Sequence, residues 1–260
     1  MALQNKKHLG QHWLHDRSAL EHIADCAELT PDDTVLEVGP GLGTLTSVLL
    51  RSAEKVVAVE FDEHLARKLP GQFPGKDLTV IHEDILQFDT SLLPKDYKVV
   101  ANVPYYITSK IIQKLMTDTN RPSIVVLLIQ KEVAQRAAAK PGDMSILAVS
   151  AQLYADVSLG DEIPAELFTP PPKVDSQVLV LKTKKPQLPN QVTEKQFFRV
   201  VKAGFSAKRK KLRSSLSGGL AMSKFELEAL LQKAHISPDA RAEDLSLAEW
   251  SQLAREYYEH

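Results

Sequence analysis

The 260-residue chain contains one cysteine, Cys26, and its formal net charge is only −1. A single cysteine excludes a disulfide-stabilised scaffold, and a chain of this length buries an adequate core without one. The longest aliphatic run, residues 124–129, is far shorter than the roughly 20 residues of a membrane helix. Residues 1–16 hold no apolar stretch typical of a signal peptide. We therefore expect a cytoplasmic globular protein with no membrane segment.

Other absences narrow the function further. The near-neutral charge argues against a uniformly basic nucleic-acid coat, although it permits a local basic face. The histidines and the cysteine show no spacing typical of metal ligands, so we expect no metal site. No internal repeat and no low-complexity tract is present.

Short β-branched runs alternate with helical patterns in the first half of the chain, at residues 34–38, 55–59, 78–82, 98–101 and 123–129. This alternation predicts an α/β fold with a doubly wound, mostly parallel sheet. Two more strands are expected near residues 153–159 and 178–183, with no direction predicted. A polar, proline-containing linker follows, and then only helical patterns, near residues 194–204, 208–217, 223–234 and 246–258. The expected domains are residues 1–182 and 194–260, joined by residues 183–193.

A strand, a glycine-rich turn and a helix are predicted around residues 34–52. The turn reads E-x-G-x-G-x-G, with Glu37 before Gly39, Gly41 and Gly43. Glycines permit a close approach of the backbone to a ligand. Glu60, at the end of the next strand, is placed to accept hydrogen bonds from ribose hydroxyls.

The acidic residue beside this turn distinguishes it from a dinucleotide-binding loop. Glu37 would repel a pyrophosphate but suits a ligand with positive charge, such as S-adenosylmethionine. Asp84 follows the third strand and is placed to accept from the adenine amine. The alternative is a turn that only packs a strand against a helix. The acidic residues at successive strand ends favour the cofactor site.

A second polar turn, Asn102-Val103-Pro104-Tyr105, follows the fourth strand. The amine of adenine is a poor nucleophile because its lone pair is delocalised into the ring. Two acceptors, the Asn102 side-chain oxygen and the Pro104 carbonyl, would free that lone pair for attack on a methyl group. Tyr105 would stack on the base. The alternative is a polar turn whose aromatic residues only cap the core.

Three further segments carry a family resemblance. Residues 7–14, K-H-L-G-Q-H-W-L, resemble L-G-Q-N/H-F-L, with Trp13 in place of the usual phenylalanine. Residues 168–176 resemble F-x-P-x-P-x-V-x-S, and residues 205–216 resemble F-x-x-R-R-K-x-L-R-N-x-L. Over nearly its whole length the chain resembles the KsgA family of bacterial small-subunit ribosomal RNA adenine dimethyltransferases, which have the class I methyltransferase (Rossmann-like) fold.

The resemblance implies a role for individual residues. It assigns Gly39 to the methionine end of S-adenosylmethionine, Glu60 to its ribose and Asp84 to its adenine, with His12 and Leu14 closing over it. The residues expected to hold the cofactor are His12, Leu14, Gly39, Gly41, Glu60, Asp84 and Asn102. The residues expected to act on the target adenine are Asn102, Pro104, Tyr105 and Phe168, with Phe168 stacked on the second face of the base.

A basic run lies in the predicted helical domain. Its members expected to bind RNA phosphates are Lys208, Arg209, Lys210, Lys211 and Arg213. Lys208 and Ser214 stand where the family has arginine and asparagine. The alternative is a solvated helix face. No acidic residue lies between Lys195 and Phe225, so the sequence favours an uncancelled positive potential.

The resemblance implies dimethylation of two adjacent adenines in the 3′-terminal hairpin loop of small-subunit (16S) rRNA, on a pre-30S particle during ribosome biogenesis. We expect a monomer, because that partner is a large particle. Two rivals stay open. One is a macrolide-resistance methyltransferase acting on 23S rRNA, and the other is a non-catalytic RNA-binding assembly factor on the same fold. A small-molecule methyltransferase is a weaker alternative, because it would not need the basic helical domain.

Overall fold

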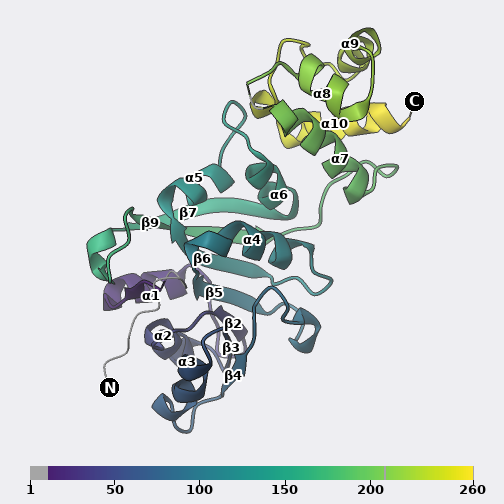
Figure 1. Ribbon diagram of the computed structural model, residues 1–260. Coiled ribbons are helices and arrows are strands. Elements are labelled where there is room, and N and C mark those ends of the chain that lie inside the picture. Colours follow the sequence, from purple (N-terminus) through teal and green to yellow (C-terminus); the bar gives the residue numbers. More distant parts are fainter. Residues whose placement is uncertain (1–10, 208, 260) are drawn as a thin grey trace. The chain divides into compact units, whose positions relative to one another are not determined.

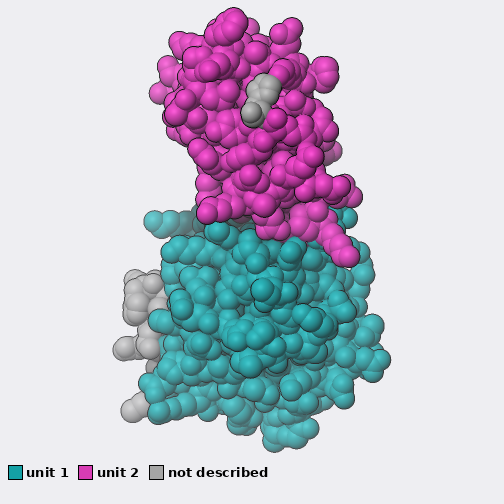
Figure 2. Space-filling view, turned by 90° about the vertical axis from the view of Figure 1, so that its right-hand side faces the viewer, with its two compact units in different colours: residues 1–135, 155–184 teal, residues 136–154, 185–260 magenta. Residues whose placement is uncertain are grey.

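The computed structural model describes residues 11–207 and 209–259 (Figure 1). The chain divides into two compact units (Figure 2). Unit 1 combines residues 1–135 with 155–184, and unit 2 combines residues 136–154 with 185–260. Each unit contains segments that are distant in the sequence, so the chain passes between the units more than once.

Unit 1 is built on a seven-stranded sheet in the order β4-β3-β2-β5-β6-β9-β7. Its strands are β2 (Thr34–Val38), β3 (Lys55–Glu60), β4 (Leu78–His82), β5 (Lys98–Asn102), β6 (Ile124–Gln130), β7 (Ala155–Ile163) and β9 (Ser176–Thr183). β2 to β6 pair in parallel, and β9 pairs antiparallel with both β6 and β7. The predicted α/β sheet is confirmed, and the direction of the last two strands is now known.

The strand order reverses between β2 and β5, which are neighbours although β3 and β4 intervene in the sequence. Right-handed crossovers then place α2 (Thr44–Ser52) and α3 (Glu63–Lys68) on one face and α4 (Thr108–Thr117) on the other (Figure 1). Ligands in such sheets bind at the carboxyl ends of the strands beside this reversal. We therefore expect a ligand site at the loops that follow β2 and β5.

The core of unit 1 lies between the sheet and its helices. β5 and β6 are apolar on both faces, and Val99, Val100, Leu127 and Leu128 have no exposed surface. Burial on both faces explains the unbroken aliphatic run of residues 124–129. α1 (Arg17–Asp25) covers the sheet as well, and its N-cap Asp16 accepts from the backbone N–H of Ala19.

Unit 2 is helical. It consists of α6 (Ile146–Tyr154), α7 (Glu194–Gly204), α8 (Leu212–Leu220), α9 (Lys224–Lys233) and α10 (Leu247–Tyr258), while α5 (Lys131–Ala137) spans the boundary between the units. Capping boxes begin α7, α9 and α10. Trp250 is fully buried, and a β-carbon at Gly204 would lie 2.3 Å from its ring, so only glycine permits this helix contact. No helix in the described part of the chain is long and apolar enough to span a membrane.

The observed units differ from the predicted domains in one segment. The sequence placed residues 136–154 in the first domain, whereas in the structure they pack with the C-terminal helices. The backbone N–H groups of Gly142 and Met144 both donate to the Glu243 carbonyl, and the Tyr154 hydroxyl donates to Glu194 at 2.7 Å. These bonds join residues far apart in sequence, which a local pattern does not reveal.

The second C-terminal helix also differs from its prediction. The sequence placed it at residues 208–217, but α8 begins at Leu212. The backbone of Lys211 bridges to Arg241, and the N–H of Leu212 donates to the Ala240 carbonyl. Arg209, Lys210 and Lys211 therefore precede α8, whereas Arg213 lies in its first turn.

Candidate active site

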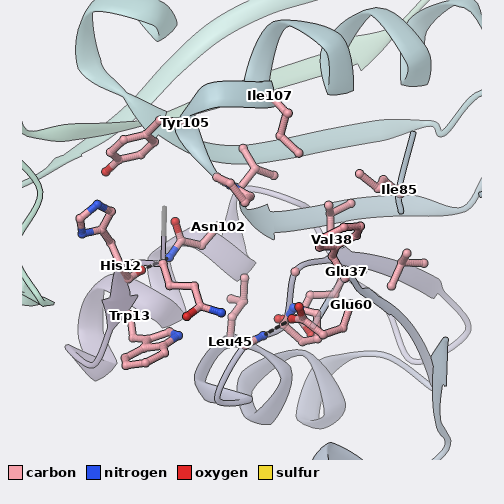
Figure 3. Close-up of a pocket in the computed structure, with 18 of the residues that line it drawn as sticks. His12, Trp13, Glu37, Val38, Leu45, Glu60, Ile85, Asn102, Tyr105 and Ile107 are labelled. Carbon is pink, nitrogen blue, oxygen red and sulfur yellow. Dashed lines mark hydrogen bonds between the residues drawn. The ribbon is translucent and has the colours of Figure 1, made fainter. Parts of the chain in front are cut away.

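A cavity of about 310 Å³ lies at the carboxyl ends of β2, β3, β4 and β5 in unit 1 (Figure 3). Its walls come from segments well separated in the sequence: residues 11–14, the glycine-rich turn, the ends of β3 and β4, and the turn after β5. The predicted residues that line it are His12, Leu14, Gly39, Gly41, Glu60, Asp84, Asn102, Pro104 and Tyr105. One cavity thus contains all of the predicted cofactor positions and three of the four predicted catalytic positions.

The glycine-rich turn carries backbone conformations that favour glycine. Gly41 has a φ of +56°, and a β-carbon there would lie 3.2 Å from Nε1 of Trp13. Its N–H donates to Oε2 of Glu60 at 3.0 Å. Gly41 therefore lets the turn contact Trp13 on one side while it bonds the end of β3 on the other.

Glu60 joins the glycine-rich turn to the start of α3. Its second oxygen, Oε1, accepts from the N–H of Asp62 at 2.8 Å, at the start of α3. Burial raises the pKa of Glu60, and these backbone hydrogen bonds oppose that rise. Each carboxylate oxygen has a second lone pair for a ligand hydroxyl. Asp84, after β4, accepts from the N–H of Leu86 at 2.9 Å and also lines the cavity.

Glu37 is 1% exposed, and its Oε2 accepts a hydrogen bond of 2.6 Å from the Thr46 hydroxyl. Burial raises the pKa of Glu37 to about 8, and the nearby charge of Glu60 adds to this rise. Without a ligand, Glu37 is therefore mostly protonated at neutral pH. This differs from the negative charge that the sequence motif implied at this position.

The turn after β5 presents an oriented amide. Nδ2 of Asn102 donates to the carbonyl of His12 at 3.1 Å, and no described residue donates to its Oδ1 (Figure 3). The Pro104 carbonyl accepts two long hydrogen bonds, 3.3 Å from the N–H of Ile107 and 3.4 Å from the Thr108 hydroxyl. The amide oxygen is thus the less committed of the two predicted acceptors.

Tyr105 is held on two sides. Its hydroxyl shares a 2.7 Å hydrogen bond with the hydroxyl of Ser176, which is completely buried at the start of β9. Its ring lies 5.7 Å from the His12 ring, with 20° between the planes (Figure 3). Burial raises the pKa of Tyr105, so the hydroxyl stays protonated at neutral pH.

Two of the resembling segments form one small sheet, which the sequence did not reveal. β1 (Trp13–Leu14) pairs antiparallel with β8 (Phe168–Thr169). In addition, Nδ1 of His12 donates to the Pro170 carbonyl at 2.8 Å. Residues more than 150 positions apart in the sequence therefore form this wall of the cavity together. No local pattern in either segment predicts the pairing.

Phe168 does not line the cavity, which differs from its predicted place against the target base. It is 2% exposed and belongs to the hydrophobic core together with Leu14, its partner across β1 and β8. Neighbouring residues on a strand point to opposite faces, and it is Thr169 that is exposed here. The aromatic ring that faces Tyr105 in the cavity is His12.

The basic run in unit 2 is partly neutralised, contrary to the sequence prediction. Lys211 forms an ion pair of 2.8 Å with Asp239, and Arg213 lies 3.3 Å from Glu228 and 3.7 Å from Asp239. These acidic residues follow the acid-free interval in the sequence, and folding brings them to the run. Arg209 and Lys210 are exposed and form no ion pair with a described residue. Lys208 lies outside the described residues.

A second basic group, outside the predicted RNA-binding residues, lies on α7. Lys195, Arg199 and Lys202 are exposed and form no ion pair within the described parts of the chain. Their spacing of four and three residues puts them on one helix face, opposite the buried Phe197, Val200 and Val201. We call these three residues the α7 stripe. The spacing alone would have revealed it.

The family model for "Ribosomal RNA adenine dimethylase" matches residues 2–259. The chain belongs to this family. It is 42% identical over 98% of its length to "Ribosomal RNA small subunit methyltransferase A" of Dehalococcoides mccartyi, covering 89% of that protein. A relative of the same name from a Nostoc species is 40% identical, with 96% of both chains covered.

Solved structures agree with this family. A dimethyladenosine transferase from Plasmodium falciparum has a TM-score of 0.79 at 26% identity, over 95% of this chain and 98% of that one. The 23S rRNA methyltransferase ErmE has a TM-score of 0.75 at 28% identity, over 94% and 98%. The predicted class I methyltransferase fold and the predicted enzyme class, an rRNA adenine dimethyltransferase, are confirmed.

Proposed function

We propose that this chain transfers methyl groups from S-adenosylmethionine to N6 of two adjacent adenines in the 3′-terminal hairpin loop of small-subunit rRNA, dimethylating each. The substrate is a pre-30S particle in the cytoplasm, and the enzyme acts as a monomer. One observation carries the proposal: the glycine-rich turn after β2 and the Asn102 turn after β5 open into the same cavity. A cofactor and an adenine amine bound there would be adjacent.

The residues present suit S-adenosylmethionine. The cofactor supplies a methyl group on a positively charged sulfur. Carboxyl groups at successive strand ends match its cationic, hydroxyl and amine groups, with Glu37 near the methionine end, Glu60 at the ribose and Asp84 at the adenine. Residues 12–14, held by the β1–β8 pairing, form the wall that closes over it.

Asn102 prepares the target nitrogen. The His12 carbonyl occupies its N–H group, so Oδ1 is available to accept from the adenine amine. An amine hydrogen-bonded to Oδ1 and to the Pro104 carbonyl turns its lone pair toward the methyl group. The methylated nitrogen is acidic and releases its proton to water, so no strong base is required. Tyr105, fixed by Ser176, stacks on the base, and the acceleration comes mainly from orientation.

The test of this assignment is Asn102→Ala beside Asn102→Asp. We expect Asn102→Ala to abolish methyl transfer to small subunits while the binding of small subunits stays near wild type. Asn102→Asp keeps an acceptor oxygen but loses the bond to His12, so we expect partial activity. Unchanged transfer in Asn102→Ala would refute the catalytic role. Unchanged binding together with no transfer even by the wild type would favour the non-catalytic assembly factor.

Unit 2 supplies phosphate contacts in this proposal. In unit 2, the α7 stripe, Arg209 and Lys210 are exposed cations that form no ion pair with a described residue, whereas Lys211 and Arg213 are already paired. Removing one phosphate-binding cation reduces the salt dependence of RNA binding by nearly one unit of the log–log slope. We expect neutralising the stripe with glutamines to reduce the slope by about 2 to 3, and the double substitution at residues 211 and 213 to reduce it less. A larger reduction of the slope in the variant at residues 211 and 213 than in the stripe variant would favour the RNA-binding residues predicted from the sequence.

A further inference from the structure

The mouth of the cavity carries an exposed aromatic ring and a cation. Tyr106 is 61% exposed and Lys110 is exposed, and both line the cavity. Tyr106 lies in the short 3-10 helix of residues 105–107, and Lys110 is in the first turn of α4. The two residues are close in the sequence, and both side chains reach the same cavity.

Tyr106 makes few contacts that would stabilise the fold. Its neighbour Tyr105 has a hydroxyl partner and a stacked ring. Tyr106 has neither a hydrogen bond nor a ring contact with any residue that the structure describes. The Tyr106 ring is therefore free to stack on a ligand at the edge of the cavity.

The position of Lys110 is electrostatically unfavourable. The first turn of a helix carries partial positive charge, which disfavours a cation. α4 has no acidic residue in that turn, and Lys110 forms no ion pair with the described part of the chain. The positive charge at the cavity mouth is therefore uncompensated and available to an anion.

We propose that Tyr106 and Lys110 bind the nucleotide next to the target adenine, with its base stacked on Tyr106 and its phosphate paired with Lys110. This inference rests on the proposed function, in which an adenine lies against Tyr105. Successive residues of a 3-10 helix point about a third of a turn apart, so the two tyrosine rings receive bases that are splayed from one another. Aromatic stacking accepts any base, and lysine pairs with any phosphate. Two adjacent adenines thus stack on the neighbouring rings of Tyr105 and Tyr106 while one of the adenines reacts.

The experiment compares Tyr106→Ala, Tyr106→Phe and Lys110→Ala in methyl transfer to undermethylated small subunits. Loss of one stacked base weakens binding about tenfold, so we expect Tyr106→Ala to raise KM for the subunits about tenfold. Tyr106→Phe keeps the ring and stays near wild type. Lys110→Ala raises KM and lowers its salt dependence by nearly one unit of slope. The dissociation constant of S-adenosylmethionine is unchanged throughout.

The matched control is Phe225→Ala, which removes another exposed aromatic ring, 83% exposed, in unit 2. It leaves KM unchanged. An unchanged KM in Tyr106→Ala overturns the proposal. An equal loss of cofactor affinity in that variant also overturns it, since Tyr106 would then belong to the cofactor wall.

A second measurement separates this inference from the proposed function. A short single-stranded RNA carries 2-aminopurine beside an adenine, and its fluorescence is quenched when the base stacks. We expect quenching by the wild type and by Tyr106→Phe but not by Tyr106→Ala, whether or not methyl transfer occurs. Equal quenching by all three proteins refutes the stacking site. Quenching with the expected ranking, in a wild type that methylates no subunit, refutes the proposed function and leaves the site standing.

Discussion

Replacing Glu37 with glutamine removes a buried titrating group whose pKa is about 8 in the fold, against an ordinary value of 4.5. A carboxyl group with a raised pKa stabilises the folded state fully below the ordinary value, and that stability is lost as pH rises toward 8. Each unit of pKa is worth about 1.4 kcal/mol. Between pH 5 and pH 7, the free energy of unfolding of the wild type should therefore fall by about 2 to 3 kcal/mol relative to Glu37→Gln.

Urea unfolding of both proteins at several pH values between 5 and 8, without ligand, measures this difference. Glutamine keeps an oxygen for the Thr46 hydroxyl, so the packing is preserved. The same substitution at the exposed Glu132 controls for the change in net charge. A difference between Glu37→Gln and the wild type that stays constant with pH would refute the assignment of a neutral, buried Glu37.

Cofactor binding should be linked to the same group. A cationic ligand beside Glu37 favours the charged carboxylate, so binding to the wild type releases a proton at neutral pH and strengthens as pH rises toward 8. Calorimetry in buffers of different ionisation enthalpy counts that proton. Glu37→Gln should bind without the release, and an equal release in both proteins would contradict the linkage.

Two further substitutions test the walls of the cavity. Gly41→Ala and Gly75→Ala both force a side chain onto a positive φ, but only the first meets Trp13; we expect Gly41→Ala to lower the melting temperature further and to weaken S-adenosylmethionine binding, whereas equal effects would exclude the Trp13 contact. Ser176→Ala removes the buried partner of Tyr105 and should lower kcat without changing cofactor affinity. Tyr105→Phe should then make the serine substitution nearly silent, and additive losses would contradict their coupling.

The sequence predicted the parts of the fold that depend on local pattern. The β-branched runs locate β2 to β6 almost to the residue. Burial on both faces leaves little ambiguity for β2, β3, β5 and β6, whereas β4 is only partly buried. The acidic and amide residues at strand ends were correctly brought into one cavity, because parallel strands end at the same edge of a sheet.

The features that the sequence did not predict depend on contacts between distant segments. The pairing of β1 with β8, which buries Phe168, joins two short segments with no complementary pattern. Lys211 and Asp239 form an ion pair although they are distant in the sequence, so the sequence alone does not predict it. The raised pKa of Glu37 follows from complete burial, which the motif alone does not reveal. The α7 stripe, in contrast, could have been read from its spacing.

The measurement that tests the central claim most directly is the transfer of labelled methyl groups from S-adenosylmethionine to purified, undermethylated small subunits, with large subunits and free rRNA assayed in parallel. We predict incorporation into small subunits alone, recovered as N6,N6-dimethyladenosine at two adjacent positions. Incorporation into 23S rRNA of large subunits, or the absence of dimethyladenosine from small subunits while cofactor still binds, would contradict the proposed function.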